Sequence, residues 1–417
     1  MKPQSKKKQV LVFMLAPPLP AVAGGDIYAV NALVPFAQEI DFHLFCYVGD
    51  EEKDGQKIRN HQAEYDRVFR SIHMQPRPLM PFQRRRLRWA LAMLQQVAYG
   101  LPFIDASYYS RSAVAAARAI VRDKGVDALE VNSAHLAFFK RFLPSSPAVL
   151  VSHNIESDIF PFWIPGELKG WRRRFVEWVA ARSRRAAREV EQENGFGFNA
   201  MTFISRNDMD RVDGSVPKYL MPLSFPRVGR PYDDRPRDQF HVLWMGGFGW
   251  YPNAEGVIWF AREIFPHLKD QLAQEGIVLH FCGSHPPEEL RAIHDGKNVH
   301  VHGFVDDINA MLDQAHLLMV PLRSGGGIRV KIVEAMSNGV PVLSTSKGCE
   351  GIGATDGRDI IVRDDPAAFA QALLAAASDA SRMRALSEAG LRLMAEQYSQ
   401  ESSLAAKRKA YEHMGVL

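Results

Sequence analysis

Short apolar runs alternate with amphipathic stretches along the whole chain. In the first half these patterns predict strands at residues 10–15, 42–48, 128–132 and 148–152, with helices at 27–40 and 111–122. Strands that are apolar on both faces and alternate with helices are typical of a parallel sheet covered by helices on both sides. The pattern therefore predicts an α/β fold with a doubly wound, Rossmann-like sheet.

The second half of the chain repeats this alternation. It predicts strands at residues 241–245, 277–282, 299–301, 317–321, 340–344 and 359–362. Between the halves, residues 226–239 are rich in proline and charge, which is typical of an interdomain linker. We therefore predict two domains, residues 1–225 and residues 240–398, that face each other across a cleft.

Three glycines separate a strand from a helix in the second half. Gly325, Gly326 and Gly327 follow the strand at 317–321, and helical spacing of apolar residues predicts a helix over 328–338. Glycines ahead of a helix let backbone N–H groups approach an anion, and the helix dipole adds positive potential there. The segment therefore predicts an anion site.

Two basic residues stand at the start of the same helix. Arg329 and Lys331 oppose the helix dipole, which favours acids at this position. This arrangement indicates a bound anion, most simply a phosphate. The alternative is a glycine-rich turn with two solvated basic residues. No Walker pattern is present, because no Gly-Lys-Ser/Thr follows the glycines.

Polar residues also follow the predicted strands of the first half. Gly24 and Gly25 come after the first strand, and His153 comes after the fourth, so all three fall at carboxyl ends, where such sheets bind ligands. A neutral imidazole there can hydrogen-bond a ligand hydroxyl, although a structural turn histidine remains the alternative. Asp26 and Glu156 are candidates for the acceptor side of a site, and each could equally be a helix cap.

Composition sets the class of the protein. The chain has 417 residues, 47% of them hydrophobic and 24% charged, which describes a soluble globular protein of two or three domains. Three cysteines without metal-ligand spacing favour a reducing compartment. No uncharged run is long enough to span a bilayer.

The N-terminus imitates a signal peptide, with lysines before an apolar run. Prolines 17, 18 and 20 interrupt that run, and the fold continues directly after it, so we expect the segment to be retained and the protein to be cytoplasmic.

Basic charge is concentrated in the first half. Residues 1–228 hold 32 basic and 23 acidic residues, against 19 and 24 in the remainder. Two segments combine tryptophan with arginine; they contain Arg84, Arg85, Arg86, Arg88, Trp89, Trp171, Arg172, Arg173 and Arg174. This combination suits an anionic membrane interface at the cytoplasmic face, and a solvated helix face with core aromatics is the alternative. We expect no nucleic acid partner, because no reading motif accompanies the arginines.

The stretch GGGIRVKIVEAMSNGVPVLST resembles the signature of the retaining glycosyltransferases of family 4, which have the two-domain GT-B fold. Weaker support comes from GFVD at 303–306, from Gly24 and Gly25, and from HNIE at 153–156. The last helix, residues 401–413, is similar to the segment that crosses back onto the first domain, so residues 399–417 are assigned to that domain.

The resemblance implies transfer of a sugar from a nucleotide-diphosphate sugar to a polysaccharide or lipid-linked acceptor. Glu334 would hold the ribose, and His153 would contact the transferred sugar. The implied donor-binding set is Gly247, Phe304, Val305, Gly325, Gly326, Gly327, Ile328 and Glu334. The implied acceptor side is Gly24, Gly25, Asp26 and Glu156. The nucleotide sugar is a co-substrate, and no cofactor or metal is expected where cationic groups neutralise the leaving diphosphate.

The chain departs from this family at two points. The family commonly has a second glutamate eight positions before Glu334, where this chain has Gly326. The usual Arg and Lys after the first strand of the donor domain are also missing, and we expect Arg329 and Lys331 to replace them.

The departure at Gly326 motivates a second hypothesis, a catalytically silent nucleotide-sugar-binding subunit that partners an active transferase. A third hypothesis is a nucleotide-sugar epimerase of the same two-domain shape.

Overall fold

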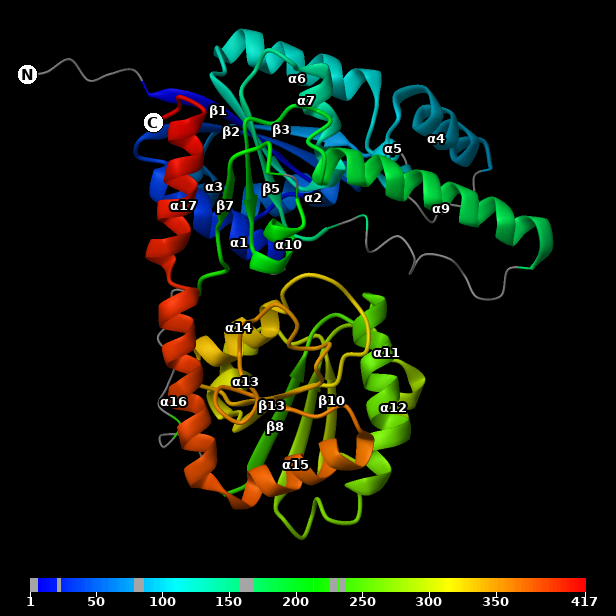
Figure 1. Cartoon of the computed structure of the whole chain (residues 1–417), viewed down its shortest axis with the longest axis vertical. Helices are drawn as coiled ribbons and strands as arrows, with labels where there is room; N and C mark the ends of the chain where they lie inside the picture. Colours follow the sequence, from blue (N-terminus) through cyan, green and yellow to red (C-terminus); the bar gives the residue numbers. More distant parts are fainter. Residues whose placement is uncertain are drawn as a thin grey trace, which may run out of the picture. The chain divides into compact units, whose positions relative to one another are not determined.

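The chain divides into two compact units, one formed by residues 1–221 and 401–417 and the other by residues 222–400. The computed structural model describes residues 7–20, 24–78, 86–155, 157, 169–212, 214–225, 232 and 238–417, without the side chains of 24–27, 86–92 and 103–104. Most of the expected linker at 226–239 lies outside the described residues. Each unit is an α/β body built around one sheet (Figure 1).

The first unit holds a seven-stranded sheet of order β3-β2-β1-β4-β5-β6-β7, in which every pair is parallel. Its strands are β1 (Lys8–Met14), β2 (Ile40–Val48), β3 (Phe69–Pro76), β4 (Ala128–Asn132), β5 (Ala148–Ser152), β6 (Ala200–Phe203) and β7 (Lys218–Leu220). The order reverses between β1 and β4, which makes the carboxyl ends of these two strands the crevice of the sheet.

Helices cover both faces of this sheet, since apolar residues of its strands pack into two separate clusters. They are α1 (Gly24–Leu33), α2 (Glu51–Asn60), α3 (Gln62–Val68), α4 (Arg86–Tyr99), α5 (Phe103–Ala106), α6 (Arg111–Lys124), α7 (Phe138–Phe142), α9 (Gly170–Glu191) and α10 (Arg206–Asp210), with short 3-10 turns η1 (Val34–Phe36) and η2 (Ala134–Leu136).

The C-terminal helix α17 (Gln400–His413) completes the first unit, as expected. Lys407 Nζ donates to Glu130 Oε1 at 2.9 Å, and the Tyr411 hydroxyl donates to Glu130 Oε2. All three side chains are buried, and Glu130 lies in the central strand β4. A buried carboxylate is costly unless it is paired, so α17 is required to stabilise the middle of this sheet.

The second unit holds a six-stranded parallel sheet of order β10-β9-β8-β11-β12-β13. Its strands are β8 (Phe240–Met245), β9 (Ile277–Cys282), β10 (Val299–Gly303), β11 (Leu317–Val320), β12 (Val342–Ser344) and β13 (Ile361–Val362). Its helices are α11 (Tyr251–Trp259), α12 (Glu288–Ala292), α13 (Ile308–Gln314), α14 (Val330–Ser337), α15 (Pro366–Ser378) and α16 (Ala380–Gln397). After α11 the chain continues through the π-helix η5 (Phe260–Ile264) and the 3-10 turn η6 (Phe265–His267).

The structure confirms the two parallel-sheet α/β bodies and corrects several boundaries. The first helix begins at Gly24 and ends at Leu33, where residues 27–40 were expected, because Pro35 follows and a 3-10 turn replaces the last part. The helix after the glycine loop begins at Val330, two residues later than expected. The strands β3, β6 and β7 were not predicted.

Candidate functional site

The glycine loop lies between β11 and α14, at the carboxyl end of the sheet of the second unit. Gly325 and Gly327 have φ of +106° and +71°, a region that strongly favours glycine. A Cβ on Gly325 would meet Trp250 at 3.0 Å and Arg329 at 3.2 Å. Two of the three glycines are therefore required by the backbone, and the loop is held in one shape.

Arg329 is buried and fastens this loop from within. Its Nη1 donates to the carbonyls of Gly326 and Gly327, the latter at 2.6 Å, and its Nη2 donates to Lys347 O at 3.4 Å. Since the guanidinium engages these carbonyl oxygens, it reduces the negative potential that they would present to an anion. The residue is thus part of the loop, and its contact with a phosphate stays a prediction.

Lys331 lies on the first turn of α14 beside the loop after β8. Its Nζ donates to Asn253 Oδ1 at 2.9 Å, and Asn253 Nδ2 donates in turn to Gly247 O at 2.8 Å. The ammonium also lies 4.3 Å from the ring centroid of Trp244. A Cβ on Gly246 would come within 2.8 Å of this nitrogen, so glycine leaves the room that the ammonium occupies.

The Lys331 ammonium is poised to change charge near neutral pH. Burial of the amine, helped by the nearby Arg329 cation, lowers its pKa to about 7. A diphosphate beside it would favour the charged form and raise that pKa again. The fold therefore holds a cation that is unfavourable without an anion, which is the electrostatic signature expected of an anion site.

A carboxylate from α11 reaches the glycine loop. The Ser324 hydroxyl donates to Glu255 Oε2 at 2.5 Å. Gly326, where the resembling family has a glutamate, has open space around the position of a Cβ. Asn253 and Glu255 were both missed in the sequence; their signal was the polar pair in the first turns of a helix that follows a glycine loop, YPNAE.

Three exposed aromatic side chains surround the same edge of the sheet. Trp250 and Tyr251 follow β8 and are 42% and 58% exposed, and Phe304 follows β10 and is 65% exposed. Large apolar side chains at a strand-end site are suited to stacking on a base or a sugar ring. Of the expected donor residues, Phe304 and Val305 lie in this loop after β10, Glu334 is half-buried on α14, and Ile328 is buried.

In the first unit, His153 follows β5 and faces α1. Its ring lies 5.4 Å from that of Tyr28 at an interplanar angle of 78°, and Tyr28 Oη donates to Met221 O at 2.8 Å. Burial of the imidazole lowers its pKa to about 4, although the Glu130 carboxylate acts in the opposite direction. The residue is therefore neutral at physiological pH, and the structure brings it beside the helix that begins with Gly24 and Gly25.

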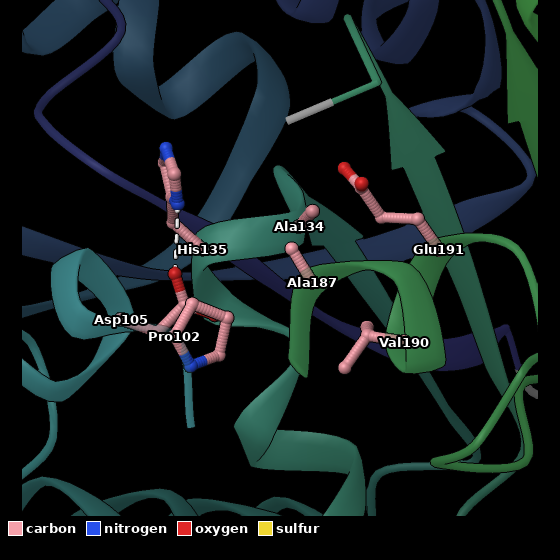
Figure 2. Close-up of a pocket in the computed structure, with 7 residues that line it drawn as sticks. All are labelled: Pro102, Asp105, Ala134, His135, Ala187, Val190 and Glu191. Atoms are coloured by element: carbon pink, nitrogen blue, oxygen red, sulfur yellow. Dashed lines mark hydrogen bonds and ion pairs between the residues drawn. The ribbon is translucent and has the colours of Figure 1, made fainter. Parts of the chain in front are cut away.

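A second polar pair, not predicted from the sequence, follows β4. His135 Nδ1 lies 2.8 Å from Asp105 Oδ1 in a small pocket that is also lined by Glu191 (Figure 2). The preceding residue but one, Ser133, has φ of +136°, which is strained for a residue with a side chain, and its hydroxyl accepts from His135 N at 3.2 Å. A buried carboxylate on Nδ1 fixes the tautomer with that proton and leaves Nε2 as an acceptor.

Residues 239–379 match the family model of the group 1 glycosyl transferases. The matched segment contains the glycine loop, α14, Lys331 and Asn253, and this match supports a glycosyltransferase. A curated relative, an uncharacterized 44.6 kDa protein of the cps region of Klebsiella pneumoniae, is 26% identical over 211 residues. That alignment covers 48% of this chain and 53% of the relative, so the chain spans about half the length of the curated relative that it matches.

Solved glycosyltransferase structures share the fold over nearly the whole chain. Sucrose-phosphate synthase from Thermosynechococcus elongatus superposes with a TM-score of 0.66 at 15% identity, covering 98% of this chain and 99% of that one. HepE from Anabaena, solved with UDP-glucose, gives 0.59 at 12% identity, covering 98% and 100%. WaaG, a glycosyltransferase of lipopolysaccharide biosynthesis, gives 0.63 at 13% identity, covering 97% and 100%. The expected GT-B fold is confirmed.

Some expected residues of this glycosyltransferase-like chain cannot be placed. Glu156, Arg84 and Arg85 lie outside the described residues. The side chains of Asp26, Arg86, Arg88 and Trp89 also lie outside them, although their backbones are helical. Their roles stay predictions.

The N-terminal half of α9 leaves its apolar face in solvent. Trp171, Phe175 and Trp178 recur at helical spacing and are 74%, 46% and 50% exposed. The buried residues of α9 are confined to its second half, where Gln96 Nε2 of α4 donates to Ser183 Oγ at 2.7 Å. Figure 1 shows the N-terminal half of α9 extending beyond the sheet of its unit. On α4, Leu94 and Val97 are also exposed.

The described residues contain neither a metal-binding cluster nor a membrane-spanning helix. No group of three or more histidine, cysteine, aspartate or glutamate side chains in that part of the chain could hold a metal ion. No helix within it is both long enough and apolar enough to cross a bilayer.

Proposed function

We propose that this chain is a metal-independent, retaining glycosyltransferase of family 4 that moves a sugar from a nucleotide-diphosphate sugar to a polysaccharide or lipid-linked acceptor. The observation that carries the proposal is Lys331, a half-buried amine of lowered pKa placed at a glycine loop and helix start within the segment that matches the family model. The nucleotide ligands of HepE, UDP and UDP-glucose, support a uridine donor as the first one to test.

In this proposal the second unit holds the donor. The diphosphate lies at the loop amides of residues 326–328 and at the α14 N-terminus, with Lys331 as the cation that neutralises the departing charge. Glu334 holds the ribose, and Phe304, Val305 and Gly247 surround the nucleotide. Glu255 supplies the carboxylate that Gly326 lacks, since it already reaches Ser324 in the same loop.

The first unit holds the acceptor in this proposal. The neutral imidazole of His153 and the Asp105-paired imidazole of His135, with Gly24, Gly25, Asp26 and Glu156, form a site suited to sugar hydroxyls rather than to phosphate. The acceptor oxygen bonds to the anomeric carbon on the face from which the phosphate leaves. The departing phosphate oxygen takes the acceptor proton, so the products are a glycoside of retained configuration and a nucleoside diphosphate.

The deciding experiment screens nucleotide sugars against the purified full chain. A donor that binds the folded chain raises its melting temperature by mass action, and the same donor should release nucleoside diphosphate, slowly with water and faster with an acceptor. NMR of the glycoside reports the anomeric configuration, and an inverted product would refute the retaining mechanism. EDTA should leave the rate unchanged.

Two other functions are tested by the same measurements: a silent donor-binding subunit, which Gly326 motivates, and an epimerase of the same two-domain shape. A silent donor-binding subunit would show the thermal shift without any release of nucleoside diphosphate. An epimerase would form a new sugar epimer with no acceptor present. Transfer to an acceptor by the isolated chain excludes both.

We further propose that α9 and α4 hold the protein on an anionic membrane surface, where a lipid-linked acceptor would lie. Residues 170–185 contain six arginines and one glutamate beside the exposed face formed by Trp171, Phe175 and Trp178. Indole rings suit the headgroup level of a bilayer, and the arginines complement lipid phosphates. Five of the ten exposed large apolar side chains in the described residues lie on these two helices.

Vesicle flotation tests the membrane proposal without any need for catalysis. The chain should float with vesicles that contain phosphatidylglycerol, less with pure phosphatidylcholine, and less at high salt. Combined Trp171→Ala, Phe175→Ala and Trp178→Ala should reduce the bound fraction at least about tenfold, since each ring contributes on the order of 2 kcal/mol when buried. Val34→Ser, at an exposed apolar residue of the same unit, serves as the control. The exposed rings could instead form a dimer interface. A native chain that is dimeric in solution and a triple variant that is monomeric would contradict the membrane proposal.

A further inference from the structure

Three histidines form a hydrogen-bonded row across the sheet of the second unit. His241 Nδ1 on β8 lies 3.0 Å from His280 Nε2 on β9, and His280 Nδ1 lies 3.0 Å from His302 Nε2 on β10. We refer to these three residues as the histidine ladder. A fourth ring, His300, stacks against it, with centroids 5.5 Å from His280 and 5.7 Å from His302. This arrangement belongs to none of the sites described above.

The ladder lies on the sheet face opposite the main core of the unit. Neighbouring residues of alternate parity, such as Val242, Phe281 and Val299, pack into that core, so the histidines point to the other side. His241 and His280 are half-buried and His302 is exposed. Since β10 is the edge strand, it is held on one side only, by β9.

Counting protons shows what this row can accept. Three neutral imidazoles carry three protons on six nitrogens, and each of the two N···N bonds needs one proton between its nitrogens. One additional proton can go to an outer nitrogen, and both bonds survive. A second additional proton has to place two N–H groups face to face. The folded ladder therefore holds at most one positive charge, whereas the same three histidines in an open chain take up three.

The surrounding groups mostly oppose charging of the ladder. Burial lowers the pKa of His280 to about 3 and lowers that of His241 and His302, with further lowering from neighbouring histidines. His300 faces all three, His294 faces His302, and Asp238 raises the pKa of His241. His316 lies in the segment before β11, and its Nδ1 accepts a hydrogen bond from the backbone N–H of His241 at 3.0 Å.

The lowered pKa values of these histidines determine how the stability of the fold changes with pH. The folded pKa values lie below that of an unfolded histidine, about 6.5. The stability that the neutral ladder contributes is therefore fully present above that pH and is lost as the pH falls below it.

The ladder ends next to the loop after β10, residues 304–307. We call this segment the nucleotide loop, because the expected donor residues Phe304 and Val305 lie in it. His302 directly precedes Gly303, whose carbonyl accepts from Gly283 N at 2.6 Å, and Phe304 and Val305 follow. We propose that the histidine ladder is a pH-sensitive latch, which holds β10 and this loop in place at neutral pH and releases them in mild acid. The part of the proposal that concerns nucleotide binding rests on the function proposed above.

Hydrogen exchange of the full chain at pH 7.5 and 5.5 tests the latch directly. After correction for intrinsic exchange rates, opening of β10 should increase roughly tenfold at the lower pH, because separation of His302 from His280 lets the chain take up one more proton, while the bond between His241 and His280 stays closed. In His280→Val, which removes the central ring, the increase should fall to a few fold or less. In His302→Gln, an exposed change whose amide can still bond His280, it should fall likewise, because no ladder histidine is left on β10.

The controls separate the ladder from general acid effects. His267→Ala, at an exposed histidine of the same unit, should keep the roughly tenfold increase of the native chain. Equal increases in all four proteins would overturn the latch. An increase that appears or disappears with EDTA would show that the rings hold a cation, and would overturn it as well.

Calorimetry with UDP then tests the link to the nucleotide loop. Charging of Lys331 raises the affinity of both proteins as the pH falls from 7.5 to 5.5, so the latch is measured as a difference: the native chain should lose affinity relative to His280→Val over this range. An equal change in both proteins would refute the link. Failure of UDP to bind at pH 7.5 would count against the proposed function, and the exchange measurement, which needs no ligand, would still decide the latch.

Discussion

The two parallel sheets share an architecture and present opposite chemistry at their carboxyl ends. In the second unit the strand ends carry glycines, a helix start and the amine of Lys331, which suit an anion. In the first unit they carry the neutral His153 and the Asp105 and His135 pair, which suit hydroxyl groups. The two sheets therefore differ in the residues just after their strands rather than in their architecture, and on the proposed function these residues select the ligand.

The largest expected effect is at the carboxyl-end edge of the second unit's sheet, where Lys331 supplies a cation. Lys331→Ala should reduce nucleoside diphosphate release about a hundredfold, because it removes the cation that faces the departing charge. Its melting temperature should not fall, since the change also removes a half-buried ammonium whose desolvation is unfavourable. Exposed Lys269→Ala is the matched control. Unchanged turnover in Lys331→Ala would remove the proposed contrast between the two edges.

His153→Gln tests the carboxyl-end edge of the first unit's sheet, where the His153 imidazole is neutral. Loss of the imidazole should lower transfer about tenfold, the effect of one hydrogen bond to a sugar hydroxyl, while UDP affinity stays the same. His413→Gln, on the exposed end of α17, is the control. If UDP affinity fell together with transfer, the assignment of His153 to sugar rather than to nucleotide would be wrong.

The pH dependence of nucleotide binding should sharpen the contrast. Because the pKa of Lys331 is about 7, the free site loses its charge as the pH rises above that value. Calorimetry should show UDP affinity falling by up to about tenfold per pH unit between pH 7.5 and 9. Lys331→Met should bind weakly at every pH in that range, and a parallel decline in this variant would assign the dependence to another group.

The smallest expected effect is at the Asp105 and His135 pair. Asp105→Asn no longer fixes the tautomer of His135, so transfer should fall a few fold and acquire a changed pH profile. His135→Gln should give a similar loss with a flat profile. A loss of melting temperature alone, with unchanged kinetics, would indicate that the pair only joins α5 to η2.

Elements with strong local patterns were predicted correctly from the sequence. The strands β4, β5 and β9 have the expected bounds, because each is a short, mostly apolar run that is almost fully buried. The sequence FRSIHMQP of β3 mixes polar and apolar residues because this strand lies at the sheet edge, half-exposed. β6 and β7 are four and three residues long and lack such a pattern.

The candidate site shows the same division. The glycine loop and its basic residues were visible locally, because consecutive residues carry the pattern. The partners of Lys331 and Ser324 come from α11, 78 and 69 residues away in the sequence, and only folding brings them together. The delayed start of α14 has a similar origin, since Arg329 turns back to the loop carbonyls and leaves Val330 as the first helical residue.

The bond between Glu130 and Lys407 also bears on how the protein is made. These partners are 277 residues apart, and the whole second unit is synthesised between them. While the ribosome adds that unit, the nascent first unit carries a central carboxylate without its partner, and its last helix does not yet exist. We therefore expect the first unit to reach its native form only after α17 has been synthesised, when residues 222–400 have already been added to the chain.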